Sequence, residues 1–144
     1  MTDFDLRTFL PYLLNQAAEA ASLEFQQVYR QRYGMLRTEW RVLFHLGIYG
    51  QMTASDISAR SQLHKTKISR AVARLEQRRY LSRRRDAEDR RVEWLELTAA
   101  GQAVYRDLHA VAARYDAGLA NDIGEQDIAA LRRILQNLAN RSSA

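Results

Sequence analysis

The chain has 144 residues, of which 47% are hydrophobic and 27% charged, with a formal net charge of +5, a balance typical of one globular domain and not of a disordered chain. The absence of cysteine excludes disulfides, thiolate nucleophiles, thiol redox switches and cysteine zinc sites. Without an apolar run of about 18 residues or a basic leader, the sequence predicts no membrane span and a cytoplasmic protein.

The first third of the chain predicts two helices. Apolar residues recur at helical spacing from Leu10 to Tyr33, with Pro11 suited to the first turn and Gly34 to the end. A second helix is expected to begin at Thr38, a good N-cap, and to carry its apolar residues before Gly47 and Gly50.

A short helix, a turn and a longer helix are expected next. Thr53 is a candidate N-cap for the short helix, with Asp56 three residues later, and residues 61–64 read as a turn. The longer helix covers about Lys65 to Arg79. Its apolar face consists of Ile68, Ala71, Val72 and Leu75.

The pattern then changes from helix to strand. Residues 80–85 and 91–97 read as two short strands joined by a polar loop over 86–90, which predicts a hairpin. Thr98 then caps a long helix, and a break at Ile123-Gly124 precedes a last amphipathic helix.

This order of elements predicts a mainly α (α+β) fold, a winged helix–turn–helix core with a two-stranded wing. We expect a single domain over residues 1–144, with the helix–turn–helix and wing at about 36–98. The helices at about 5–34 and 99–141 are too apolar for that small core alone. A second copy of the chain is their simplest partner, which makes them candidate dimerisation helices.

The positive charge is confined to one block of the chain. Residues 60–91 carry 12 Lys and Arg against 4 Asp and Glu, a local net charge of +8, whereas the remainder has a net charge of −3. Concentrated basic charge on a folded segment indicates a polyanionic partner. Charge alone fits a solvated arginine-rich surface equally well.

The polar face of the helix from Lys65 has the chemistry needed in a major groove. The chain's only two lysines, Lys65 and Lys67, lie in its first turn. At 100° per residue, the side opposite the apolar face carries Thr66, Ser69, Arg70 and Arg74. This face has donors for bases and phosphates and no acidic residue. An ordinary solvated helix face is the alternative, and the preceding turn and helix favour nucleic acid.

The predicted hairpin concentrates arginines near its tip. They are Arg83, Arg84, Arg85, Arg90 and Arg91. Such a cluster repels itself unless it is neutralised. We expect the nearby Asp86, Glu88 and Asp89 to do so partly in the free protein, and phosphates to do so better in a complex. An arginine at a hairpin tip can enter a narrow minor groove, and Asp89 can hold it through a bidentate pair. A hairpin with surface salt bridges only is the alternative.

Three segments resemble the MarR/SlyA family. Residues 86–101 are similar to its wing signature, DxxDRRxxxLxLTxxG, with every defining position filled. Leu36-Arg37-Thr38-Glu39-Trp40-Arg41-Val42-Leu43 resembles the family's second helix, and Lys65-Thr66-Lys67-Ile68-Ser69-Arg70 its recognition helix. Arg79-Tyr80-Leu81 departs from the pattern, since the family usually has a glycine before the wing.

The resemblance implies a homodimeric transcriptional regulator, with repression as the family default, on a pseudo-palindromic operator of double-stranded DNA. Each recognition helix would enter a major groove, and each wing the neighbouring minor groove. In the helix, the residues so assigned are Thr66, Ser69, Arg70 and Arg74 for bases or nearby phosphates, and Lys65 and Lys67 for the backbone. In the wing, Arg91 would enter the minor groove and Asp89 would position it. Arg90 is the alternative minor-groove arginine, and Arg85 would be a further DNA-binding residue beside them.

The resemblance also implies an effector, because members often respond to small aromatic or phenolic acids bound between the dimer helices and the winged domain. Tyr12, Arg41 and His45 are candidate ligand residues, although Tyr12 and His45 fit a core or interface equally well. A ligand that prefers another separation of the two recognition helices would lower DNA affinity by population shift.

Other functions are disfavoured. The histidines, His45, His64 and His109, are scattered, and no catalytic triad, HExxH, glycine-rich phosphate loop or Walker motif occurs. We therefore expect no catalytic residue, no cofactor and no metal site, including the zinc site that some relatives use. A winged-helix module that binds protein and a non-specific architectural DNA-binding protein stay open as alternatives. Phosphate contacts predict a steep loss of affinity with salt, which a protein-binding module does not.

Overall fold

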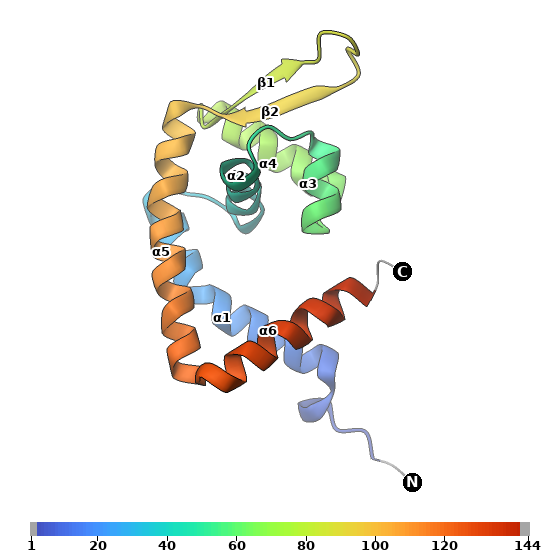
Figure 1. Ribbon diagram of the computed structural model, residues 1–144, viewed down its shortest axis with the longest axis vertical. Coiled ribbons are helices and arrows are strands. Elements are labelled where there is room, and N and C mark those ends of the chain that lie inside the picture. The colour runs from blue at the N-terminus through green and yellow to red at the C-terminus, as the bar shows by residue number, and fades with distance from the viewer. Residues whose placement is uncertain (1–2, 142–144) are drawn as a thin grey trace. The chain divides into compact units, whose positions relative to one another are not determined.

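The computed structural model describes residues 3–141, which form two compact units, one ending at His109 and one beginning at Ala110. The first unit contains η1 (Leu6–Thr8), α1 (Leu10–Tyr33), α2 (Arg37–Tyr49), α3 (Ala54–Ser61), α4 (Lys65–Gln77), β1 (Leu81–Arg85), β2 (Glu93–Leu97) and the start of α5 (Ala99–Ile123) (Figure 1). The second contains the rest of α5 and α6 (Glu125–Asn140). No helix within residues 3–141 is long and apolar enough to span a membrane.

Helix α2 begins earlier than predicted and continues past Gly47 up to Gly50, the second of the two glycines expected near its end. Leu36, and not Thr38, precedes its first turn, where the Glu39 carboxylate accepts a hydrogen bond of 3.0 Å from the Leu36 amide. The helix continues through Gly47 to Tyr49. Gly47 lies against the Tyr105 ring, because a Cβ built on it would be 2.4 Å from that ring. This glycine allows α2 and α5 to approach closely and does not end the helix.

The local signals for α3 and α4 are confirmed. Thr53 and Asp56 form the expected capping box, with each side chain accepting a hydrogen bond from the other residue's backbone amide. After α3 the chain turns at Gln62, and His64 Nδ1 accepts from the Thr66 amide at 3.2 Å, which caps α4. All four apolar residues predicted for the inner face of α4 are buried.

Arg79 occupies the position where the family pattern has glycine. Helix α4 ends at Gln77, and the amides of Arg79 and Tyr80 donate to the carbonyls of Glu76 and Leu75, each at 2.9 Å. This is a Schellman motif, which requires a left-handed residue, and Arg79 has a φ of 63°. The departure in sequence therefore leaves the turn geometry intact and places a strained arginine in it.

Replacing Arg79 with glycine is expected to raise the free energy of unfolding by about 0.5–1 kcal/mol, because glycine adopts this conformation without steric cost. Urea denaturation measures the change. Arg78→Gly is the matched control, since the Arg78 guanidinium donates to the carbonyls of Tyr33 and Gly34 at the end of α1. That variant should be destabilised. A loss of stability in Arg79→Gly comparable to the control would show that the arginine side chain matters more than its backbone strain.

The two strands form an antiparallel hairpin that extends from the helical cluster α2–α4, with its loop at the free end (Figure 1). Arg83 pairs with Leu95 and Arg85 with Glu93 in the strand register. Met52 adds an isolated bridge to Leu95, with hydrogen bonds of 2.8 and 3.1 Å. This third segment anchors the base of the hairpin to the chain between α2 and α3.

The start of α5 is fixed against the end of α4. The Thr98 hydroxyl donates to the carbonyl of Arg79 at 2.6 Å and accepts from the amide of Gly101 at 3.1 Å. The Thr98 amide also donates to the Tyr80 carbonyl. A Cβ built on Gly101 would lie 1.9 Å from that Tyr80 oxygen. The threonine and glycine of the wing signature thus hold the helix, the turn and the hairpin together.

The apolar core lies entirely in the first unit. It comprises Phe25, Tyr29, Met35, Val42, Leu43, Leu46, Met52, Ile57, Ile68, Ala71, Val72, Leu75, Leu81, Leu95, Val104 and Leu108. Within residues 110–141 of the second unit, no side chain is buried. Its exposed large apolar residues are Ile123, Leu131, Ile134, Leu135 and Leu138. A helix with such a stripe lacks a partner within its own unit.

Candidate nucleic-acid interface

The polar face of α4 is fully available for contacts. All six side chains assigned to it by sequence are exposed: Lys65, Thr66, Lys67, Ser69, Arg70 and Arg74. Among residues 3–141, none of its four basic groups forms a hydrogen bond or an ion pair. An N-terminal helix turn capped by a histidine and flanked by two lysines is electropositive. This face can donate to an anion without first breaking an internal contact.

The wing tip holds one arginine in the expected way. Arg91 is exposed, and its Nε and Nη2 donate to the two carboxylate oxygens of Asp89 at 3.1 and 3.4 Å. Arg85 instead uses Nη1 to donate to the Arg90 carbonyl at 2.8 Å across the hairpin. Arg90 is exposed. The bidentate pair limits the directions in which Arg91 can point.

Asp86 organises the loop that carries this pair. One of its oxygens accepts from the amides of Glu88 and Asp89 at 3.1 and 3.0 Å, and the other accepts from Trp94 Nε1 at 3.1 Å. These hydrogen bonds, that from Trp94 first, hold the pKa of Asp86 below the usual aspartate value of 3.8. From the sequence, Asp86 was expected only to neutralise nearby arginines. Its place in the wing signature could have indicated a structural role, whereas nothing in the sequence indicated the contact with Trp94.

The hydrogen bonds that Asp86 makes in the wing loop are expected to persist in mildly acidic solution. Because the pKa of Asp86 is lower in the folded chain, its contribution to stability is complete above pH 3.8 and is lost as the pH falls through the lower folded value. The indole N–H resonance of Trp94 should therefore be constant from pH 7 to about pH 4.5 and change below that. Trp40→Phe leaves one indole to assign, and Asp86→Asn should abolish the transition. A midpoint above 3.8 would contradict this account.

Two further wing arginines contact residues outside the hairpin loop. Arg83 pairs with Glu76 of α4 at 2.9 Å and with Glu93 of β2 at 3.0 Å. Arg84 donates to the side-chain oxygen of Gln51. The loop carboxylates thus neutralise only part of the cluster, as expected, through the Asp89–Arg91 pair and the attraction between Asp86 and Arg84. The strand register permits the Arg83–Glu93 pair, since it places Glu93 opposite Arg85 and therefore diagonally across from Arg83 on the same face of the hairpin.

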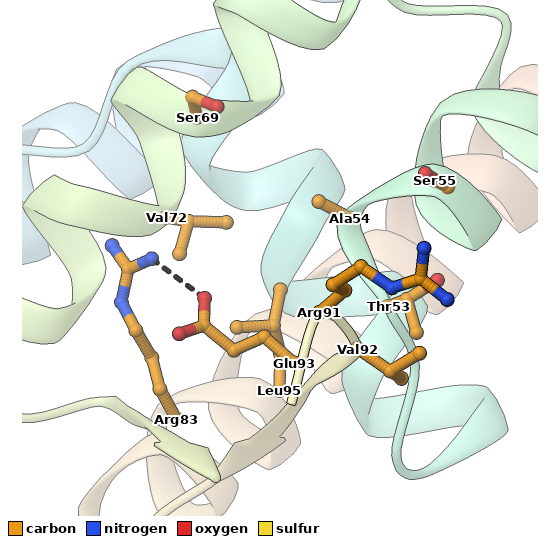
Figure 2. A pocket seen from close by; sticks show the side chains of 10 residues that line it. All are labelled: Thr53, Ala54, Ser55, Ser69, Val72, Arg83, Arg91, Val92, Glu93 and Leu95. Carbon is orange, nitrogen blue, oxygen red and sulfur yellow. Dashed lines mark hydrogen bonds and ion pairs between the residues drawn. The ribbon is translucent and has the colours of Figure 1, made fainter. Parts of the chain in front are cut away.

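A cavity of about 390 Å³ joins α4 to the wing (Figure 2). Ser69 of α4 and Arg91 of the wing both line it, as do Thr53 and Ser55 at the start of α3. Figure 2 shows the Arg83–Glu93 ion pair at the same cavity. The structure thus brings together two residues that the sequence assigned to different DNA grooves, and adds the hydroxyls of α3.

The candidate ligand residues are only partly brought together. Arg41 and His45 are half-buried, one turn apart on α2, where His45 Nδ1 lies 2.6 Å from the Arg41 carbonyl. Burial lowers the pKa of the Arg41 guanidinium. Tyr12 is exposed on α1, and no hydrogen bond or ring contact within residues 3–141 joins it to either. No group of three or more His, Asp or Glu in this range is placed to hold a metal ion.

Aromatic side chains pack next to Arg41 and His45. Trp40 contacts the rings of Phe25 and Phe44 at centroid distances of 5.3 and 5.1 Å, and Arg41 lies 5.9 Å from the Trp40 ring. Phe44 in turn contacts Tyr105 of α5. The half-buried cation beside this cluster is an arrangement that can bind a planar anion.

Comparison with known proteins agrees with the fold and the motifs. A model described as MarR family matches residues 33–92. The HTH-type transcriptional regulator FarR of Neisseria gonorrhoeae is 26% identical over 132 residues, 91% of this chain and 89% of that protein. A MarR/EmrR family regulator from Acinetobacter sp. ADP1 superimposes with a TM-score of 0.86 at 26% identity, covering 97% of this chain and 99% of that one.

A second solved structure, a MarR family transcriptional regulator from Silicibacter pomeroyi DSS-3, has a TM-score of 0.83 at 28% identity and covers 96% of this chain and 98% of its own. The segment matched by the family model contains α2, α3, α4 and the wing arginines, and the structural likeness extends to the helices on both sides. The chain thus matches the MarR family of winged-helix transcriptional regulators over residues 33–92, and it shares the fold of that family's solved structures over nearly its whole length.

Proposed function

We propose that the protein is a homodimeric repressor that binds a pseudo-palindromic operator on double-stranded DNA in the cytoplasm. The observation that carries this proposal is the exposed polar face of α4, whose cations have no partner in the described part of the chain, beside a wing arginine held by a carboxylate. Arg70 and Arg74 would contact bases or nearby phosphates in the major groove, and Arg91 would enter the minor groove. Arg90 is the alternative at the tip.

The proposed DNA contacts divide into two kinds. Lys65 and Lys67 would bind phosphates at the start of α4, where the free amides and the helix dipole favour an anion. Thr66, Ser69 and Arg70 would meet base edges, since the N-terminal part of a recognition helix reads the groove. Phosphate contacts set affinity, and base contacts set specificity.

Dimerisation through the terminal helices is part of the proposal. Apolar side chains of α6, among them Leu131, Ile134 and Leu135, are exposed, as are Leu10 and Leu13 of α1. A monomer rarely leaves such stripes uncovered. A two-fold dimer covers the same surface on both copies and would separate the two α4 helices by about one turn of DNA, ~34 Å.

We propose a small aromatic or phenolic acid as the effector. NadR, which is 25% identical to this chain with a TM-score of 0.77, has been crystallised with 4-hydroxyphenylacetate. The half-buried Arg41 is the natural partner of a carboxylate here, with His45 and the ring cluster around Trp40 beside it. Binding of such an acid would favour a conformation with lower DNA affinity. Tyr12 would contribute only if the dimer brings another segment to it.

The test is a DNA-binding titration with the full chain. A duplex enriched by the protein from a random pool, and a shuffled duplex of the same composition, are titrated by fluorescence anisotropy at two salt concentrations, and the mass of the complex is measured. We expect one dimer per enriched duplex, tighter binding than to shuffled DNA, and a steep loss of affinity with salt. Equal binding to both duplexes would favour the architectural alternative, and no salt-sensitive binding would favour the protein-binding module.

A further inference from the structure

Glu39 is a buried carboxylate with an unsatisfied oxygen. Its side chain is 1% exposed, which makes it the one buried charged residue among those described. Oε2 accepts from the Leu36 amide, whereas Oε1 has no hydrogen-bond partner within residues 3–141. Leaving a buried acceptor unpaired costs about 1–3 kcal/mol, and more for a charged group. Such a group in a folded protein calls for a partner in some state of the molecule.

The candidate partners are the cations of the proposed reading face. A cavity of about 220 Å³ between the start of α2 and α4 is lined by Leu36, Thr38, Glu39, Lys67, Arg70, Ala71 and Arg74. Glu39 is its only acidic lining residue, and the small side chain of Ala71 leaves the space open. None of the three cations is paired within residues 3–141. Among residues 3–141, one side of the cavity thus holds a carboxylate with one free oxygen, and the other holds cations without a partner.

Arg70 is the cation best suited to use this acid. It lies nearer the N-terminal end of α4 than Arg74, where base edges are read. Its guanidinium has five donors in a planar fork, so it can donate to a guanine edge and to a carboxylate at the same time. Lys67 is a point charge in the first turn and suits a phosphate.

We infer that Glu39 is a positioning residue for Arg70, with its free Oε1 accepting a guanidinium N–H when α4 enters the major groove. The inference rests on the proposed function, because it concerns how α4 reads DNA. A buried carboxylate restricts the rotamers of the arginine above it and so lowers the entropy lost on binding. It also opposes the positive field of α4, which disfavours binding to phosphates alone. Glu39 would therefore raise specificity and lower non-specific affinity.

Glu39→Gln separates these effects from a structural role. Glutamine keeps the size of the side chain and an oxygen for the Leu36 amide, so the cap of α2 can persist, and it removes the charge. We expect the preference for the enriched duplex over the shuffled one to fall about ten-fold, the loss of one charge-assisted hydrogen bond. Binding to shuffled DNA should become tighter. The matched control is Glu88→Gln, an exposed acid of the wing loop, which should tighten binding to both duplexes equally.

A double-mutant cycle identifies the partner. Arg70→Ala should reduce the preference for the enriched duplex much more in the wild-type chain than in the Glu39→Gln background, whereas Arg74→Ala should have the same effect in both. Thermal melting of each variant reports any loss of folding.

The outcomes are distinct. If Glu39→Gln binds both duplexes more tightly by the same factor, Glu39 acts only through its charge. If the variant melts at a lower temperature and binds both duplexes more weakly by the same factor, Glu39 has only a structural role. Either result overturns the inference. Additivity with Arg70→Ala would also overturn it. If the wild-type chain enriches no duplex at all, the proposed function itself fails, a result separate from these three.

Discussion

Replacing Gly101 with alanine is expected to lower the free energy of unfolding by about 3 kcal/mol, the upper part of the range for an overpacked site. The new Cβ would lie 1.9 Å from the Tyr80 carbonyl oxygen and 2.9 Å from its carbon. Both are backbone atoms, so no side-chain rotation relieves the clash. The start of α5 must move away, and the hydrogen bond from the Thr98 amide to the Tyr80 carbonyl is then lost.

Thermal and urea denaturation at equal protein concentration measure this change, which should lower the melting temperature by roughly 10 °C. Gly118→Ala is the matched control in the same helix, since a Cβ built there meets nothing within 4 Å. Alanine should stabilise that position by about 0.5–1 kcal/mol. A Gly101→Ala chain as stable as the wild type would show that the approach of α5 to Tyr80 is looser than the structure has it.

Replacing Arg70 with alanine is expected to weaken binding to the enriched duplex by 10- to 100-fold, the range of about 1–3 kcal/mol for one bidentate base contact. Affinity for shuffled DNA should fall much less, because that binding depends on phosphates. Arg70 is exposed and unpaired among the described residues, so its removal should not change the melting temperature.

Two controls distinguish a base contact of Arg70 from a general effect of its positive charge. Arg114→Ala removes an exposed arginine of α5 outside the basic block and should leave both affinities nearly unchanged. Lys65→Ala should weaken binding to both duplexes equally, and it should reduce the salt dependence of the affinity by the amount expected for about one phosphate contact. If Arg70→Ala behaves like Lys65→Ala, Arg70 binds the backbone, and the reading face of α4 has been assigned wrongly.

Much of the fold was predictable because its signals are local. Helical periodicity predicted α1, α4, α5 and α6, the Thr53–Asp56 pair predicted the start of α3, and the change of period at residue 80 predicted the hairpin. The start of α2 was predicted wrongly, and of the two glycines near its end only Gly50 follows its last turn. Thr38 has the residue type of an N-cap and Gly47 that of a helix end, yet a carboxylate cap at Glu39 and packing against Tyr105 decided the bounds.

The candidate site was predictable as a set of residue types and less so as a set of contacts. Charge density and helical geometry identified the polar face of α4, and the wing signature identified the Asp89–Arg91 pair, whose members are two residues apart. The roles of Asp86 and Glu39 could not be read in the same way. Their partners, Trp94 in one case and the lining of a cavity in the other, come from other elements.

Local patterns in the sequence were enough to predict the resemblance to the MarR family, the order of elements and the location of the basic surface, because periodicity, capping and charge act over a few neighbouring residues. Which arginines form ion pairs depends on contacts between distant segments, since Glu76 of α4 and Glu93 of β2 meet at Arg83 through packing and strand register. Tertiary packing also gives the Arg79 backbone a left-handed conformation, and it places the buried Glu39 in the lining of a cavity shared with the cations of α4. Contacts between distant segments depend on the whole core, which no local pattern encodes.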